Sequence, residues 1–346
     1  MRFAFAQELL SDGFDGPADE CRRSGHALAL AGGRVFAVGG GQFAAISPPM
    51  LQFDLAAGRW TLLNAAGDAP DADVAGCVLF ADGRASLLAF GGRLGGGRLS
   101  DKLFRLDLRQ RRWMLAAQVG PDRPAPRSGA LACGVGHRLY LMSGDAGGEH
   151  GGGIGCSRRS ADLWQLDAAQ CRWTRLPDPP IEVAESADCL SGVGADCLFA
   201  VGGGCCWQFD LFTRRWSRVP VSRPAGWGDD CFIIFDDEET GSHRSRRLLA
   251  ATAGGGRQLF VLGCDGAVDS LDTCLATAWQ PVPPADSAAV AGLPRYLAAA
   301  CTYTADAADA SDSAGSFGLL VQGGLAWPSG RPLADLQLLR FREQIV

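Results

Sequence analysis

A short pattern, an apolar strand that ends in glycine, recurs along the whole chain. Its copies are RVFAVGG (34–40), SLLAFGG (86–92), RLYLMSG (138–144), CLFAVGG (197–203), LLAATAGG (248–255) and GLLVQGG (318–324). The last glycines of successive copies lie 52 to 69 residues apart. A period of this length indicates a repeated structural unit rather than the periodicity of a single helix or strand. The six copies therefore predict six units.

In four of the six units the glycine-ended strand is followed by a second pattern, an aspartate and a tryptophan at a fixed spacing. The pairs Asp54 and Trp60, Asp107 and Trp113, Asp167 and Trp173, and Asp210 and Trp216 each span six positions. Glycine adopts positive φ at little cost and has no Cβ, so the glycine pair is expected to turn the chain where the units crowd around a channel. The tryptophan is expected to supply buried area between neighbouring units. Both features are interpreted as architecture, with no chemistry assigned to them.

The glycine pairs, aspartates and tryptophans resemble the signature of the kelch family over nearly the whole chain. This resemblance implies an all-β fold, a six-bladed kelch-type β-propeller, as a single domain over residues 1–346. The blades are expected at 23–63, 74–115, 127–176, 186–219, 229–282 and 295–341, the last together with 2–10. The resemblance is specific for fold and much less so for function, because propellers host scaffolds and enzymes alike.

Blades five and six depart from the regular pattern. Either Gly254 and Gly255 or Gly263 can end the second strand of blade five, and similarity to blade four favours Gly254 and Gly255. That choice leaves residues 263–277 as an insertion between the third and fourth strands. Blade six has no tryptophan for a fourth strand, so the N-terminal strand (2–10) is expected to close it, with Phe5 in place of the tryptophan. Such closure pairs both termini in one sheet and removes an exposed edge.

Composition and charge exclude several classes of protein. The net charge is -6, and basic residues form short clusters rather than a broad stripe with aromatics, so no nucleic-acid partner is expected. No apolar stretch approaches the length of a membrane-spanning helix, so no membrane insertion is expected. The acidic N-terminal segment does not resemble a transit peptide. The 13 cysteines show no disulfide framework. These features favour a reduced, cytoplasmic location, free or on a cytosolic or cytoskeletal assembly.

No catalytic, metal or cofactor site is predicted. A copper site resembling that of galactose oxidase would need paired tyrosines and histidines, and the chain has three tyrosines and few histidines. Closely spaced ligand pairs typical of zinc are absent. The glycine-rich segment 144–160 precedes a strand rather than a helix, so it is interpreted as a long loop and not a phosphate loop. A protein-interaction scaffold or adaptor subunit of a larger complex is favoured, and a propeller enzyme or small-ligand binder is the alternative.

The resemblance also implies where other proteins bind. Kelch domains that capture peptides use the face formed by the loops between strands two and three and between successive blades. Carried over by position, this face contains Arg23, Ser24, Arg93, Arg127, Ser128, Glu185, Asp229, Asp230 and Arg295. The loops between strands two and three are expected to be long in blades one to three and nearly absent in blades four and five. Insertions at 236–246, 263–277 and 304–316 are expected on the opposite face.

Overall fold

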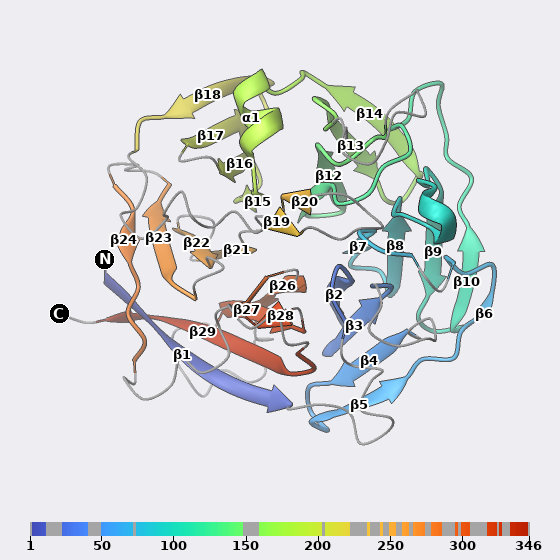
Figure 1. Cartoon of the computed structure of the whole chain (residues 1–346), viewed down its shortest axis with the longest axis horizontal. Helices are drawn as coiled ribbons and strands as arrows, with labels where there is room; N and C mark the ends of the chain where they lie inside the picture. Colours follow the sequence, from blue (N-terminus) through green and yellow to red (C-terminus); the bar gives the residue numbers. More distant parts are fainter. Residues whose placement is uncertain are drawn as a thin grey trace.

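The computed structural model shows a ring of β-sheets (Figure 1). It describes residues 2–11, 23–40, 50–71, 74–147, 159–202, 205–221, 234–235, 243–244, 249–253, 258–262, 266–273, 278–285, 295–296, 299–304, 317–323, 325–326 and 333–344. Within these residues six sheets each contain four consecutive antiparallel strands, which are the blades. In the same part of the chain, no helix is long and apolar enough to cross a membrane.

The strands of each blade run from the centre of the ring outward in sheet order. Blade one contains β2 (Ala27–Ala31), β3 (Arg34–Val38), β4 (Leu51–Asp54) and β5 (Arg59–Leu62). Blade two contains β7 (Val78–Ala81), β8 (Ser86–Phe90), β9 (Leu103–Asp107) and β10 (Arg112–Leu115), with β6 (Ala66–Gly67) added in parallel to β10. Blade three contains β11 (Leu131–Val135), β12 (Arg138–Met142), β13 (Leu163–Asp167) and β14 (Arg172–Leu176).

The second half of the ring is built in the same way. Blade four contains β15 (Cys189–Val193), β16 (Cys197–Gly202), β17 (Cys205–Asp210) and β18 (Arg215–Val219). Blade five contains β21 (Leu249–Ala253), β22 (Gln258–Leu262), β23 (Val268–Asp272) and β24 (Gln280–Pro281). Blade six contains β26 (Ala299–Thr304), β27 (Phe317–Gln322), β29 (Leu336–Gln344) and β1 (Arg2–Ser11). Each innermost strand contacts the innermost strands of both neighbouring blades, so the ring is closed.

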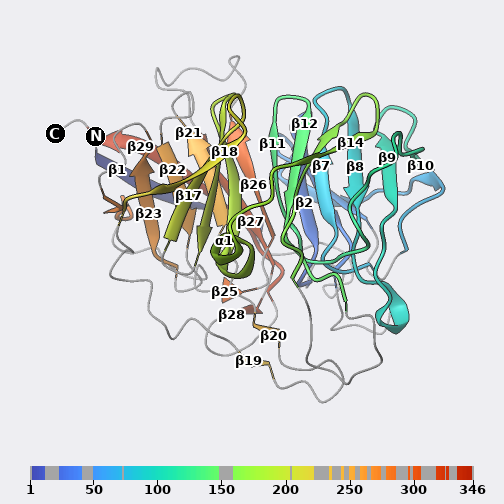
Figure 2. The ribbon, with the colours of Figure 1, turned by 90° about the horizontal axis from the view of Figure 1, so that it is seen from above.

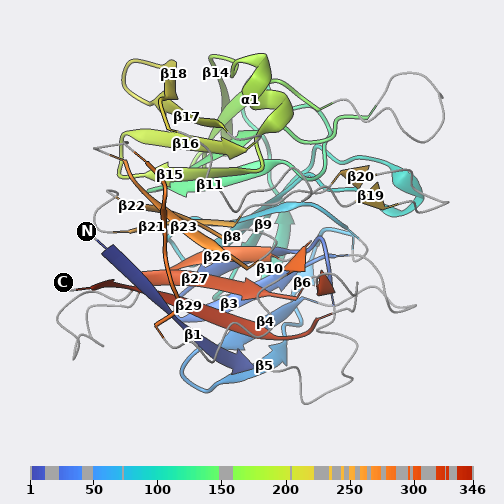
Figure 3. The ribbon, with the colours of Figure 1, turned by 60° about the vertical axis from the view of Figure 1, so that its left-hand side comes forward.

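The N-terminal strand closes blade six, as the sequence predicted. Strand β1 pairs antiparallel with β29, with Phe5 opposite Phe341, and the two chain ends lie side by side (Figure 3). The side chain of Phe5 lies outside the described part of the structure. The side chain of Phe341 stacks on Phe260 of blade five, with ring centroids 4.2 Å apart. Blades five and six therefore share an aromatic contact next to the closing strand.

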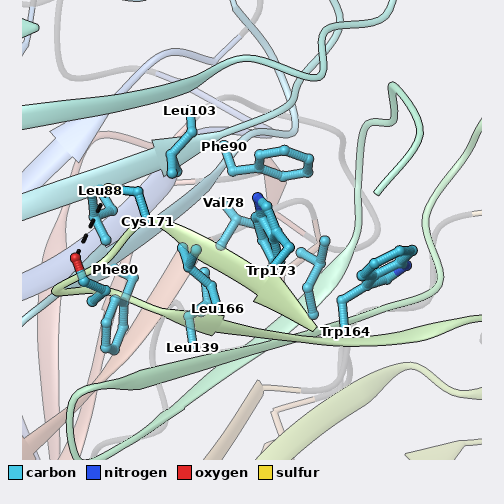
Figure 4. Close-up of a cluster of buried hydrophobic side chains, with 12 residues drawn as sticks. Val78, Phe80, Leu88, Phe90, Leu103, Leu139, Trp164, Leu166, Cys171 and Trp173 are labelled. Atoms are coloured by element: carbon cyan, nitrogen blue, oxygen red, sulfur yellow. Dashed lines mark hydrogen bonds between the residues drawn. The ribbon is translucent and has the colours of Figure 1, made fainter. Parts of the chain in front are cut away.

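The fixed spacing from aspartate to tryptophan has a structural cause. In blade three, Asp167 accepts hydrogen bonds from the backbone N–H groups of Ala169 and Gln170 and so closes the turn between strands three and four. Trp173 then lies edge-on to Phe90 of blade two, with ring centroids 4.9 Å apart (Figure 4). Its indole N–H donates to the side chain of Gln118 in the connection between the two blades. The tryptophan therefore joins neighbouring blades, as predicted.

The glycine pair is required where one blade meets the next. In blade two, Gly91 and Gly92 have φ of +72° and +100°. A Cβ atom on Gly91 would lie 2.7 Å from the carbonyl oxygen of Arg127 at the entry to blade three. The backbone N–H of Gly92 donates to that same oxygen over 2.8 Å. Only glycine meets both the conformational and the steric requirement without strain.

The prediction for blade five is wrong. Leu249–Ala253 is the first strand of this blade and pairs with β22, so β22, which precedes Gly263, is the second strand. Residues 268–272, which were expected to belong to an insertion, form the third strand. The strands of the blade accordingly begin at Leu249 rather than near residue 229. The wholly buried strand QLFVL pairs on both sides, which is what a second strand must do.

The blades give the propeller two different ends. We call the end with the connections between strands one and two and between strands three and four the turn end. We call the other, with the connections between strands two and three and between blades, the loop end. Figure 2 shows β25 (Arg295–Tyr296), β28 (Leu325–Ala326), β19 (Ile234–Phe235) and β20 (His243–Arg244) beyond the blade strands at the loop end.

This arrangement corrects the placement of two predicted insertions. The hairpin of β19 and β20 precedes the first strand of blade five and lies at the loop end, whereas the segment 236–246 was expected on the opposite face. Residues 263–267 link the second and third strands of blade five and so also belong to the loop end. Residues 305–316 lie outside the described part of the structure.

Candidate interaction face

The loop end of blades one to three is built from a repeated entry segment before each innermost strand. The glycines of these segments, Gly25, Gly76 and Gly129, all have φ near +63°. The N–H of Gly76 donates to the carbonyl of Gly25 over 2.7 Å, and the N–H of Gly129 donates to the carbonyl of Gly76 over 2.8 Å. These bonds join blade to blade and fix the position of the residues on either side of each glycine.

Arg127 does not lie on the surface. It is 1% exposed, and its guanidinium makes a two-pronged ion pair with Asp162 at 2.6 and 2.7 Å. It also donates to the carbonyls of Ala125 and Ser143. Burial by itself raises the pKa of Asp162, but the hydrogen bonds and charge of Arg127 outweigh it, so the pKa of this carboxyl is lowered. The sequence prediction that Arg127 contacts a partner is corrected, because its donors already bind within blade three.

Arg23 occupies the equivalent position in blade one and is buried to the same extent. It is 1% exposed and donates to the carbonyl of Gly39, the first glycine of the pair in its own blade. Arg127 makes the matching contact to Ser143, which precedes Gly144 in blade three. The arginine of the entry segment therefore holds the glycine pair in place, and the prediction that Arg23 is a surface donor is corrected in the same way.

Among the predicted arginines whose side chains the structure describes, Arg93 is partly exposed, at 36% of its side chain. Its guanidinium lies 2.5 Å from Asp145 of blade three and donates to the carbonyl of Gly97 in η1 (Gly95–Gly97). Asp145 was not identified from the sequence, although it directly follows the glycine pair position of blade three. The ion pair crosses from blade two to blade three on the surface of the loop end.

The structure describes the remaining predicted residues to different extents. Ser128 is 9% exposed, and its backbone exchanges two hydrogen bonds with Asp145, so the structure brings Ser128 and Arg93 together around that aspartate. Ser24 is half-buried in the equivalent segment of blade one. Glu185 belongs to α1 (Ile181–Ser186) and Arg295 to β25, both at the loop end, but their side chains lie outside the described part. Asp229 and Asp230 lie wholly outside it.

Other exposed charges at the loop end have mixed signs. Arg98 and Lys102 are exposed in the connection between β8 and β9. Arg123, in the connection from blade two to blade three, lies 3.6 Å from Asp101. The long connections of blades one to three (39–50, 91–102 and 143–162) contrast with the short ones of blades four and five (203–204 and 263–267). The lengths of these connections therefore differ between blades, as the sequence predicted for blades one to four. In blade five the prediction referred to the connection after Gly254 and Gly255, which lies between strands one and two.

The described residues contain no group of three or more His, Cys, Asp or Glu side chains that could hold a metal ion. The cysteines described are all free thiols. Cys205 and Cys206 lie in one strand, and Cys206 is buried while Cys205 is partly exposed, as expected for neighbours on opposite faces. Burial raises the pKa of the Cys206 thiol to about 12. The prediction that the chain binds no metal stays a prediction.

The closed ring, the glycine pairs and the tryptophans between blades define a kelch-type β-propeller. A model of the KLHDC2/KLHL20/DRC7 Kelch-repeats domain matches residues 25–235, and the chain belongs to the kelch-repeat family. The chain is also similar to Host cell factor 2 of Homo sapiens, with 25% identity over 237 residues. That alignment covers 61% of this chain and 29% of the human protein, so the chain corresponds to less than a third of that relative.

Proposed function

We propose that this propeller is a non-catalytic protein-interaction scaffold or adaptor subunit that binds a partner protein at its loop end. One observation carries the proposal. Apart from β6 on the rim, the described elements outside the blade strands belong to loop-end connections: η1, α1, the β19–β20 hairpin and the β25–β28 pair. Connections that are longer than closure of the blades requires are where propellers and other rigid scaffolds carry their function.

The shape and chemistry of this end support a protein partner. The connections between strands two and three are long in blades one to three and only two residues long in blade four. Arg93 and Asp145 present an ion pair that is only partly exposed, and Arg98, Lys102 and Arg123 add exposed donors nearby. Mixed charges on a rigid frame favour specificity and a fast association rate more than raw affinity.

The test is capture of interacting proteins from native cells with the full chain, followed by mass spectrometry. A loop-end variant carries Arg98→Glu, Lys102→Glu and Arg123→Glu. A matched turn-end variant carries Arg84→Glu, Arg109→Glu and Arg112→Glu in the same blade. The proposal predicts at least one protein that is recovered with the wild type and the turn-end variant but lost with the loop-end variant. If no recovered protein depends on the loop-end residues, the proposal is wrong.

The non-catalytic part of the proposal has a separate test. Elemental analysis of the purified chain is expected to find no stoichiometric copper, iron or zinc. About one metal ion per chain that survives mild chelation would contradict the proposal and favour a propeller enzyme.

A further inference from the structure

The turn end of blades one to four repeats one construction four times. In each blade an aspartate at the end of the third strand accepts two backbone N–H bonds from the following turn. In each blade a backbone bond also joins this turn to the turn between strands one and two. The fourth residue after the aspartate always has positive φ: Gly58, Arg111, Cys171 and Arg214. The eight turns therefore form a rigid surface.

This surface carries a series of exposed arginines. An arginine precedes each tryptophan and lies directly opposite the aspartate across the strand pair, and these are Arg59, Arg112, Arg172 and Arg215. Further exposed arginines of the same turns and strand ends are Arg34, Arg84, Arg109, Arg111, Arg138 and Arg214. Along the sequence these residues form only short basic clusters, because whole blades separate them and the fold alone brings them to one end.

The carboxylates of the same surface offset only part of this charge. Asp54, Asp107, Asp167 and Asp210 accept backbone hydrogen bonds in their turns, and Asp54 also pairs with Arg34 over 3.1 Å. Asp82 is buried and accepts from the backbone N–H groups of Arg84 and Ser86 and from the Ser86 hydroxyl. Asp196 is the exposed carboxylate of the described turns. Backbone hydrogen bonds lower the pKa of Asp54 and Asp210, so both are ionised at neutral pH. Arginines still outnumber carboxylates here, although the chain as a whole has a net charge of -6.

A fully exposed aromatic residue lies among these arginines. Phe212 is 93% exposed in the turn of blade four, and Thr213 and Arg214 follow it. The equivalent turn positions in the other three blades hold Ala56, Arg109 and Ala169, which form the same turn. The turn therefore does not need an aromatic side chain, and Phe212 gains no burial from the fold. Aromatic residues and arginines are both enriched at the cores of protein interfaces.

We infer that the turn end of blades one to four binds an acidic segment of a partner protein, separately from the loop end. Arginine's planar fork matches the geometry of a carboxylate, and each blade offers one such fork beside its aspartate. Nucleic acid fits this surface less well. Its backbone carries a charge about every 1.7 Å of duplex, so an aspartate in every blade would lie against that continuous charge, whereas an acidic protein segment can place uncharged residues opposite the aspartates. Phe212 adds an apolar contact for a hydrophobic side chain within the acidic segment.

The experiment uses the full purified chain and two fluorescent 20-residue peptides. One peptide is polyglutamate, and the other is polyglutamate with leucine at every fifth position. The wild type is expected to bind both, more weakly as salt is raised. Replacing Arg112, Arg172 and Arg215 together by Glu is expected to weaken binding about tenfold or more, because it adds repulsion as well as removing contacts. Phe212→Ala is expected to weaken binding of the leucine-containing peptide and to leave binding of polyglutamate unchanged.

Three controls keep the result interpretable. The same three arginines changed to Gln preserve much of each side chain's packing, and thermal melting shows that both triple variants fold. The loop-end variant with Arg98→Glu, Lys102→Glu and Arg123→Glu is expected to bind both peptides as the wild type does. Equal loss in the turn-end and loop-end variants, unchanged binding in the folded turn-end variants, or tighter binding of a 20-nucleotide single-stranded DNA than of either peptide would overturn the inference. None of these outcomes depends on the cellular partners of the loop end.

Discussion

Two arginines that recur from blade to blade, one at each end of the propeller, have opposite roles. At the loop end Arg23 and Arg127 are buried and bond to backbone carbonyls, so their role is to hold one blade's entry segment against its glycine pair. At the turn end the arginine before each tryptophan is exposed and leaves the turn to be closed by the aspartate. The position of each arginine relative to its strand therefore decides whether it supports the fold or is available to a partner.

The largest effect is expected from removing the strand that completes blade six, because this strand joins the two ends of the chain in one sheet. Removal of residues 1–10 deletes the outer strand of blade six and its ladder of bonds to β29. At roughly 0.5–1.5 kcal/mol for each lost hydrogen bond, we expect several kcal/mol of destabilisation. Thermal melting of the truncated chain measures it. An unchanged melting temperature would show that blade six does not need β1.

The next effect separates the arginines of the two ends within one blade. Arg127→Ala leaves Asp162 partly buried without its partner and should destabilise the chain by about 3–5 kcal/mol. Arg172→Ala at the turn end of the same blade removes an exposed residue and should change stability by about 0.5 kcal/mol or less. Urea unfolding compares the two variants. Equal small effects would show that Arg127 is not structural.

The same ion pair gives stability a defined dependence on pH. The pKa of Asp162 is lowered in the folded chain, so its contribution is fully present above the unfolded value of about 3.9 and is lost as pH falls through the folded value. The wild type should therefore lose stability in acid over that range. Asp162→Asn should lack this part of the loss while being less stable at pH 7. Unfolding curves of both proteins between pH 2 and 7 provide the measurement.

A smaller effect compares two glycines of blade two that share a φ of +72°. Gly83 at the turn end has open space around it, whereas a Cβ on Gly91 at the loop end would lie 2.7 Å from the carbonyl oxygen of Arg127. Gly83→Ala should cost about 1–2 kcal/mol for the left-handed conformation alone. Gly91→Ala adds a backbone clash and should cost about 1–3 kcal/mol more. A similar loss in the free energy of unfolding for both variants, measured with urea, would mean that the backbone near Gly91 shifts to accommodate the Cβ atom.

Much of the fold was predictable because the informative residues act locally and repeat. The aspartate closes a turn two and three residues away, and the tryptophan follows at a fixed distance, so four identical spacings were sufficient. Blade five was misassigned because its first strand, LAATA, is also followed by glycines. The pairing of Val268–Asp272 with β22 is a contact between strands, which the sequence of either strand alone does not show.

The candidate site was less predictable, since it depends on burial and on contacts between blades. Arg127 precedes a glycine motif at the loop end and Arg93 follows one. Arg127 is nevertheless buried against Asp162 and Ser143, whereas Arg93 is partly exposed. The arginines before the tryptophans had a visible signal, the repeated Arg-Trp pair at 59–60, 112–113, 172–173 and 215–216. The sequence does not show that these four arginines share one surface, because only the closed ring places the four turns at the same end.

The sequence itself provides a direct probe of where a partner protein binds. Lys102 is the one lysine of the sequence, and it is exposed at the loop end of blade two. An amine-specific cross-linker applied to the captured complex should join Lys102 to partner peptides identified by mass spectrometry. Moving the probe to the turn end of the same blade, with Lys102→Arg and Arg109→Lys together, should abolish those cross-links to the loop-end partner. Cross-links to that partner from the relocated lysine, and none from Lys102 in the wild type, would contradict the proposed role of the loop end.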